Sequence, residues 1–318
     1  MKRSRWISPE RGKLKTKLLC VYFLLLVLPL GLFTIYAYSR IRGTAREQTL
    51  SAAQNAFDSS AASVQQALDT LDEVLDILAA DPLVYAMASN DPADFSYIKR
   101  LEDSDQLELT FQHLRKLSGV AQIRLYVDNG YLYTSGRSSI MQAGEAAGSG
   151  WYEAVTGGGG RSWFAPADLS DQPEAERQRF AAMRVIYNPR AVLEPLAILR
   201  ADTDAAYILQ YLNAPPVVEN GTLMLLRGDQ VLCASEGGRA AEEWVDLAGR
   251  LPASGGGWEP VEWEGRRYYA QCRDLEGMDW RMASVLPAAG VFRLSTELRL
   301  EMLAVVVAWR SSLPAAVP

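Results

Sequence analysis

The stretch AQIRLYVDNGYLYT, at residues 121–134, has the pattern of a β-hairpin. Ile123, Leu125 and Val127 alternate with more polar residues, which is the two-residue period of a strand that buries one face. The Asp-Asn-Gly sequence that follows is a strong signal for a tight turn. We therefore expect residues 121–127 and 131–134 to form two antiparallel strands joined by that turn.

The same pattern returns one hundred residues later in LMLLRGDQVLCAS, at residues 223–235. Each predicted hairpin is followed by a short helix, a Gly-rich turn with a Trp-bearing strand, and two further strands. These stretches are residues 151–155, 157–164, 180–187 and 195–202 in the first copy, and 242–250, 255–263, 267–273 and 280–286 in the second. The repeat predicts an α+β protein with two tandem units, each a five-stranded antiparallel sheet with helices on one side.

A long helix is expected before the first unit, over residues 40–80. Apolar residues recur every seven positions from Leu50 to Leu78, and Ala61, Leu68 and Leu75 follow at the four-residue offset. Neither Gly nor Pro occurs between Thr44 and Asp81. The apolar stripe either packs along the chain's own globular units or forms the seam of a homodimer, and the two can coexist on different helix faces.

The N-terminus has the pattern of a membrane anchor. Residues 18–39 are 22 uncharged and mostly apolar residues, enough to span a bilayer as a helix. Residues 1–17 carry seven Lys or Arg and one acid, which predicts that this end is cytoplasmic and that the body after Arg40 lies outside. The alternative is a cleaved signal peptide, for which Ala37-Tyr38-Ser39 would be the cleavage site, but the apolar run is longer than a usual signal core.

Composition shifts suggest the order of the parts. Pro215-Pro216 marks a linker between the two units, and the uncharged run at residues 302–309 is too short to span a membrane. That run fits either an incomplete second membrane segment or an ordinary amphipathic terminal helix. The expected parts are a basic tip (1–17), a transmembrane helix (18–39), a stalk helix (40–80), a membrane-distal unit (81–214), a membrane-proximal unit (215–290) and a helix leading to the incomplete segment (291–318).

The composition excludes several classes of function. The basic tip precedes an acidic body, whereas a nucleic-acid-binding protein needs a basic face on its folded part. The single histidine, His113, argues against His-based metal sites and catalytic triads. Cys233 and Cys272 both fall in the second predicted unit and could pair if that unit lies outside the cell. We expect no cofactor, no bound metal and no catalytic site.

The ordered set of elements resembles the double Cache (dCache) sensor family over about residues 40–290. It is most similar to the outer part of YesM-like bacterial sensor histidine kinases. The stretches that carry the resemblance are residues 151–155 with the Gly run and Arg161-Ser162-Trp163-Phe164, residues 185–189 with 196–202, and residues 279–287. The resemblance implies two PAS-like units, a small-molecule ligand in the membrane-distal one, and signal transfer through the helices across the membrane. A PAS-like sheet would separate the strands of Cys233 and Cys272, so we expect two separate buried thiols.

The resemblance does not bring kinase activity to this chain. Kinases of that type need a phosphate-accepting histidine in a Pro-His-Phe context, which His113 lacks. The four glycines at residues 157–160 are followed by Arg161 and a Trp-bearing strand, without the Gly-Lys-Ser/Thr of a phosphate-binding loop. We therefore interpret this run as a turn.

Ligand contacts are expected from the inward strand faces and the helix-to-strand loops of the membrane-distal unit. Asp202 stands where amino-acid-binding relatives place an amine-binding Asp, but Ser149 occupies the position of their carboxylate-binding Arg. A sugar or a peptide is therefore as plausible a ligand as an amino acid. The candidate residues are Tyr126, Tyr133, Arg137, Trp151, Trp163, Arg184, Tyr187 and Asp202.

Three functions remain open at this point. The first is the sensor of a transmembrane histidine kinase. The second is the same sensor feeding a chemotaxis transducer or a cyclic-dinucleotide enzyme. The third is an anchored extracellular hydrolase, for which Asp168 and Asp171 are loop acids near Trp163 but have no His partner and no recognisable catalytic spacing.

Overall fold

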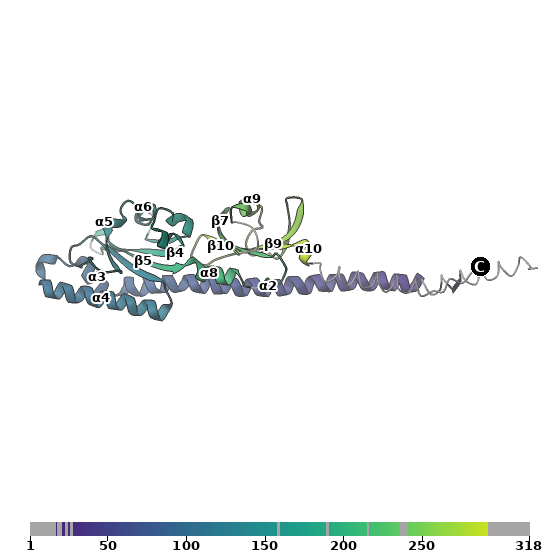
Figure 1. Ribbon diagram of the computed structural model, residues 1–318, viewed down its shortest axis with the longest axis horizontal. Helices are drawn as coiled ribbons and strands as arrows, with labels where there is room; N and C mark the ends of the chain where they lie inside the picture. Colours follow the sequence, from purple (N-terminus) through teal and green to yellow (C-terminus); the bar gives the residue numbers. More distant parts are fainter. Residues whose placement is uncertain are drawn as a thin grey trace, which may run out of the picture. The chain divides into compact units, whose positions relative to one another are not determined.

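A computed structural model describes residues 17, 21–22, 25, 28–157, 160–188, 191–214, 216–235 and 241–291. The chain forms two compact units, which we describe separately. The first unit comprises Met1–Ala53 and Ala288–Pro318, and the second comprises Gln54–Pro287. Both β-sheets belong to the second unit (Figure 1).

The described residues of the first unit lie mainly in helix α2 (Leu28–Ala80), which continues into the second unit, and in the short helix α10 (Ala288–Val291). Among the described residues, no helix has an apolar stretch long enough to cross a membrane. The predicted span at 18–39 includes positions outside the described set, namely 18–20, 23–24 and 26–27, so it stays a prediction. The predicted tip at 1–17 and terminal segment at 291–318 also lie outside it, except for Lys17 and Val291.

The first sheet of the second unit has five strands in the spatial order β2-β1-β5-β4-β3. β1 and β4 are mostly buried along their length, without the alternation of a strand that has one exposed face, because both faces of the sheet are covered. The strands are β1 (Gln122–Val127), β2 (Ile140–Gln142), β3 (Arg161–Phe164), β4 (Arg179–Asn188) and β5 (Ala191–Asp204).

The second sheet has the same order when its strands are counted from its own first strand, β7-β6-β10-β9-β8. All its pairings are antiparallel. The predicted duplication is therefore confirmed as two five-stranded sheets with the same strand order, which differ in that β1 and β2 of the first sheet are parallel. The strands are β6 (Thr222–Arg227), β7 (Gln230–Ala234), β8 (Glu259–Trp263), β9 (Arg266–Asp274) and β10 (Trp280–Pro287).

The predicted first hairpin is wrong in its second strand. Residues 131–134 form no strand, and the partner of β1 is β2, which pairs with it in parallel. The reason is a set of contacts with helix α4 (Tyr97–Ser118): the Tyr131 hydroxyl donates to Asp103 Oδ2 at 2.6 Å, and the Tyr133 N–H donates to Ser104 Oγ at 3.0 Å. These bonds satisfy the backbone and side chain away from the sheet, and the chain returns to β1 only at Ile140.

The predicted long helix is confirmed, and its apolar stripe packs against the chain's own sheets. Residues from Phe57 to Leu78 along the stripe are buried in one core with strands of both sheets and with α4. Helix α2 ends before Asp81, which caps the next helix, α3 (Pro82–Ser89). The Asp81 side chain accepts from the Leu83 N–H at 2.8 Å, and Pro82 lies in the first turn of α3. The predicted homodimer stays a prediction.

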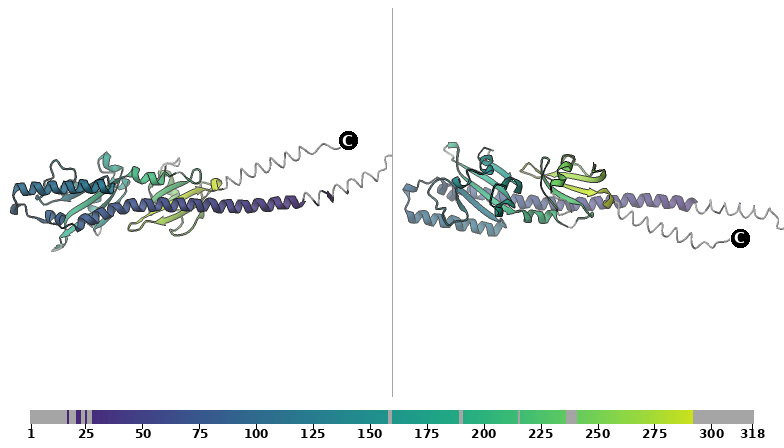
Figure 2. Two further views of the ribbon diagram at one scale, coloured as in Figure 1. Left: turned by 90° about the horizontal axis from the view of Figure 1, so that it is seen from below. Right: turned by 45° about the horizontal axis from the view of Figure 1, so that its top comes forward.

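The sequence pattern predicted helices on only one side of each sheet. In the structure, helical elements pack on both faces of each sheet. On one face of the first sheet α2 and α4 lie side by side (Figure 2). The opposite face is covered by short elements, and helix α8 (Ala205–Leu212) leads from the first sheet towards the second. On the first sheet these include α5 (Ala143–Ala146), α6 (Gly150–Gly157) and η3 (Pro166–Leu169), whereas η4 (Ala241–Trp244) and α9 (Val245–Ala248) pack on the second sheet. The remaining short elements are η2 (Pro92–Asp94) and α7 (Glu174–Arg177).

Cys233 on β7 and Cys272 on β9 are free thiols, as predicted. The strand order places β6 and β10 between their strands, so the two sulfur atoms are on non-neighbouring strands. Burial raises the pKa of Cys233 to about 12 and that of Cys272 to about 11. Both side chains therefore act as small apolar groups of the second sheet.

These thiols should react slowly with iodoacetamide, because the thiolate is the reactive form. In a Cys20→Ser background, the folded protein should be alkylated on the order of a hundredfold more slowly than the urea-unfolded protein at the same pH. Mass spectrometry of the alkylated peptides measures the two rates separately. A fast reaction of either cysteine in the folded protein would contradict the assigned burial.

Candidate functional site

Strand alternation separates the predicted ligand residues into groups on different sides of the first sheet. Tyr126 on β1 and Asp202 on β5 point to the face covered by helix α6, which contributes Trp151. Tyr187 on β4 is half-buried at the edge of the same apolar cluster. These four residues are the part of the predicted set that the structure brings to one face.

Trp163 and Arg184 lie on the opposite face. Trp163 packs with its ring centroid 6.1 Å from that of Trp280, a residue of the second sheet. Arg184 forms an ion pair with Asp76 of α2. Both therefore serve contacts between the first sheet and other elements of the unit.

Tyr133 and Arg137 lie beyond the end of β1, against α4. The Tyr133 ring packs edge-on to Tyr97 at 5.3 Å and lies under the Arg100 guanidinium at 4.8 Å. Arg137 pairs with Asp105 of α4. The structure does not bring these two residues to Asp202.

A buried cluster of charges surrounds Asp202. Arg124 on β1 and Arg200 on β5 are directly opposite each other in the antiparallel register. Like charges in this position repel each other. Glu176 of α7 lies between them and compensates the repulsion: its Oε1 is 2.7 Å from Arg124 Nη2, and its Oε2 is 3.2 Å from Arg200 Nη1.

Asp202 is the second carboxylate of this cluster. Its Oδ1 accepts from Arg200 Nε at 2.8 Å, and both side chains are 0% exposed. Arg179 on β4 approaches Asp202 Oδ2 to 3.9 Å. Gln122 joins the arginines, because its Oε1 accepts from Arg124 at 2.9 Å and from Arg179 at 2.7 Å. We name Arg124, Glu176, Arg179, Arg200 and Asp202 the buried charge cluster.

The electrostatics of the two acids differ. Burial opposes ionisation of Glu176, but the hydrogen bond from Arg124 and the charges of Arg124 and Arg200 outweigh it and lower the pKa of Glu176. Burial raises the pKa of Asp202, and Arg200 opposes that rise. Asp202 therefore depends on the arginines beside it to be held in the charged form.

An aromatic wall borders the cluster. The rings of Tyr126 and Trp151 are 5.2 Å apart, and the Arg200 guanidinium lies 5.6 Å from the Trp151 ring. Within the described part of the chain, several buried polar atoms here have no hydrogen-bond partner: Arg124 Nε, Arg200 Nη2, Trp151 Nε1 and Asp202 Oδ2. Buried polar groups normally have partners, so these atoms are free to bind a ligand.

Of the predicted residues, Tyr126, Trp151 and Asp202 lie at this cluster, whereas Arg124, Arg179, Arg200 and Glu176 were not among them. Arg124 is two residues from Tyr126, and Arg200 is two residues from Asp202. Because side chains two apart in a strand share a face, that spacing could have identified both arginines. No comparable signal marks Glu176, which reaches the cluster from a loop and a single helical turn.

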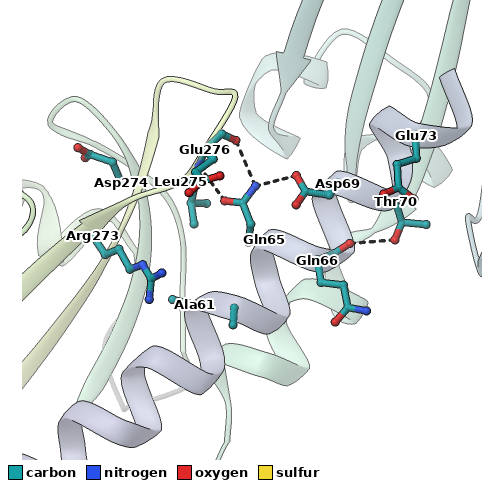
Figure 3. A pocket seen from close by; sticks show the side chains of 11 residues that line it. Ala61, Gln65, Gln66, Asp69, Thr70, Glu73, Arg273, Asp274, Leu275 and Glu276 are labelled. Atoms are coloured by element: carbon teal, nitrogen blue, oxygen red, sulfur yellow. Dashed lines mark hydrogen bonds between the residues drawn. The ribbon is translucent and has the colours of Figure 1, made fainter. Parts of the chain in front are cut away.

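A separate pocket of about 370 Å³ lies elsewhere in the second unit, between α2 and the turn from β9 to β10 (Figure 3). It contains none of the predicted ligand residues. On one wall, the Gln65 amide donates to the Glu276 carbonyl at 3.1 Å and accepts from the Glu276 N–H at 2.8 Å. This pair of bonds fixes the turn to the helix, so we interpret the pocket as a consequence of that junction.

Replacing Gln65 by alanine should lower the free energy of unfolding by about 1 kcal/mol, because two hydrogen bonds to the turn are lost where water can partly replace them. Gln66→Ala, at the next and exposed position of the helix, is the matched control and should change stability by less than about 0.5 kcal/mol. Urea unfolding followed by circular dichroism measures both. Equal effects of the two substitutions would contradict the assigned role of Gln65.

Two five-stranded sheets with the same strand order, both packed on a single long helix, have the fold of double Cache domains, as the sequence predicted. Solved structures of such domains match most of the chain. The ligand-binding domain of Mlp24 with asparagine has a TM-score of 0.52 and 12% identity, and covers 79% of this chain and 99% of its own. That of the Campylobacter jejuni chemoreceptor Tlp3 with L-valine has a TM-score of 0.51 and 10% identity, over 79% of this chain and 97% of its own.

Another solved structure comes from a different receptor type. The extracellular domain of rpHK1S-Z16, assigned as a histidine kinase, has a TM-score of 0.53 and 13% identity, over 77% of this chain and 97% of its own. No family model matches the sequence, and no curated protein gives a significant match. At these identities the likeness concerns the fold.

Proposed function

We propose that this chain is the extracytoplasmic small-molecule-sensing part of a membrane-bound bacterial receptor. The observation that carries the proposal is the buried charge cluster with unpartnered polar atoms, beside the Tyr126–Trp151 wall on the first sheet. Sensor domains with this fold have been solved with asparagine and with L-valine. The basic tip before the apolar run at residues 18–39 supports the membrane topology.

A ligand panel tests the sensing function. A compound that binds the folded chain raises its melting temperature according to its concentration and affinity. The full chain in detergent should be stabilised by at least one compound among amino acids, short peptides, sugars and small organic acids, as measured by differential scanning fluorimetry. The proposal would be abandoned if none of these classes changed the melting temperature.

A protease test addresses the topology. In intact cells, added protease should remove the second unit while an N-terminal epitope tag and a cytosolic control protein stay intact. Detection of the tag and the second unit by separate antibodies distinguishes the outcomes. Survival of the second unit, at a protease concentration that degrades a known surface protein, would place it inside the cell and end the proposal.

The output we propose is a histidine kinase, because the arrangement of anchor, stalk and two units resembles the outer part of kinases of that type. The fold likeness to the extracellular domain of rpHK1S-Z16 is compatible with it, and the likeness to chemoreceptor domains supports a chemotaxis output as the alternative. Receptor precipitated from its native cells should take up label from ATP on an acid-labile phosphohistidine. Absence of that label favours the chemotaxis output.

We also propose that the chain acts by binding and not by catalysis. Incubation with panels of glycans and peptides should leave them intact, while a bound compound stabilises the protein. Turnover of any panel member, lost on replacing Asp168 or Asp171, would favour the hydrolase hypothesis. Asp168 instead contributes to structure here: its Oδ2 accepts from the Ala165 N–H at 2.7 Å, and it pairs with Arg227 of β6.

A further inference from the structure

The Glu176 carboxylate occupies a position between two arginines of the buried charge cluster, where a negative charge is favoured. Arg124 and Arg200 face each other across two strands, and their mutual repulsion must be neutralised by a negative group placed between them. Glu176 provides that group from outside the sheet. We propose that the sensor binds a small carboxylate anion whose carboxylate takes the place of Glu176 between Arg124 and Arg200, a deepening that rests on the proposed sensing function.

The charge balance favours an anionic ligand. Three guanidinium groups, those of Arg124, Arg179 and Arg200, are met by three carboxylates: the buried Asp202, the mostly buried Glu176 and the exposed Asp204, which pairs with Arg179. A ligand carboxylate that replaced Glu176 would keep this balance. A neutral or cationic ligand in the same place would leave two opposed arginines buried without compensation, which is strongly unfavourable.

The donors around Glu176 exceed what its carboxylate uses. Arg200 Nη1 pairs with Glu176, but Arg200 Nη2, Arg124 Nε and Trp151 Nε1 are buried and have no hydrogen-bond partner among the described residues. Guanidinium groups bind carboxylates through two parallel hydrogen bonds when the geometry allows it. A free carboxylate can orient itself to form such pairs, whereas Glu176 is restrained by its own backbone.

Glu176 is also the most easily displaced member of the cluster. Its side chain is 14% exposed and therefore reachable from solvent, while those of Arg200 and Asp202 are 0% exposed. It belongs to the four-residue helix α7, in the connection between η3 and β4, and not to a strand. Its replacement therefore requires no change in the pairing of the sheet. The organic part of the ligand would contact the rings of Tyr126 and Trp151.

Chemical rescue tests the exchange directly. Glu176→Ala keeps the β-carbon and removes a CH₂–COO⁻ group, which acetate replaces atom for atom apart from hydrogen. The full chain carrying Glu176→Ala should be less stable than the wild type in chloride, and acetate at constant ionic strength should restore its melting temperature. The acetate concentration needed for half of the effect should be at least about tenfold lower for Glu176→Ala than for the wild type, because the internal competitor is gone.

Three controls make the result specific. Acetamide has the size of acetate without its charge and should not restore stability. Glu174→Ala, at an exposed position of the same helix, should respond to acetate like the wild type. Glu176→Gln loses the charge but fills the space, so acetate should not restore it. If Glu176→Ala cannot be purified in chloride, acetate buffer should recover it, and failure to do so counts against the proposal.

The inference is overturned if acetate leaves Glu176→Ala unchanged, stabilises all variants equally, or is matched by acetamide. The experiments distinguish failure of this anion site from failure of the proposed sensing function. If a neutral sugar stabilises the wild type but acetate does not restore Glu176→Ala, the chain is a sensor without this anion site. If acetate restores Glu176→Ala but no compound of the panel stabilises the wild type, the anion site exists and the sensing function fails.

Discussion

Replacing Asp202 by alanine should lower the free energy of unfolding by about 3–5 kcal/mol. The substitution removes the carboxylate that accepts from Arg200 Nε at 2.8 Å and leaves a guanidinium that is 0% exposed. Glu176 remains 3.2 Å from Arg200 Nη1, but removing one partner of a buried, hydrogen-bonded charge is among the most destabilising changes that a single substitution can cause. Urea unfolding of the full chain, followed by tryptophan fluorescence, measures the loss.

Asp204→Ala is the matched control for this prediction. Asp204 ends the same strand and lies 3.4 Å from Arg179 Nε, but its side chain is 62% exposed, so its loss should cost less than about 1 kcal/mol. Replacing Asp202 by leucine and Arg200 by methionine together should recover most of the stability lost on Asp202→Ala, because no charge remains unpaired between them. If Asp202→Ala proves as mild as Asp204→Ala, Asp202 is not a charged partner of Arg200.

The regular elements could be predicted from sequence because their signals are local. β4, β5, β9 and β10 each have alternating or continuous apolar residues bounded by turns, and all four form within a few residues of their predicted limits. The stripe on α2 predicted both the helix and the face that it buries. The second strand of the first hairpin could not be predicted, because Tyr131 is fixed by Asp103, a residue 28 positions earlier on another element.

The candidate site also has a part that local sequence patterns predict and a part that they do not. Tyr126, Trp151 and Asp202 come together because strand and helix periodicity placed them on one face of the first sheet. Tyr133 and Arg137 lie elsewhere, because their contacts are with α4 and not with a predicted second strand. A sequence pattern shows which residues share a face, but it does not show which loop residue from outside the sheet completes a site.

The second large effect is expected at the junction of the two sheets. Trp280 is the first residue of β10, in the second sheet, yet its ring packs against Phe180 at 5.6 Å and Trp163 at 6.1 Å in the first sheet. It is 1% exposed and lies in the same core as α2. Trp280→Ala should therefore cost about 3–5 kcal/mol by removing a large buried side chain that both sheets contact.

The number of unfolding transitions in Trp280→Ala shows whether the two sheets still unfold together. Trp244→Ala is the control, because Trp244 stacks on Trp263 at 5.3 Å inside the second sheet's own cluster. Both substitutions should destabilise the chain, but only Trp280→Ala should split one calorimetric transition into two, since it removes contacts between the sheets. Hydrogen exchange should then show β4 protected while β9 opens, or the reverse.

A single transition in Trp280→Ala, with β4 and β9 still opening together, would mean that α2 and the Asp168–Arg227 ion pair suffice to couple the sheets. A signal passing between the sheets would then not require the aromatic contact.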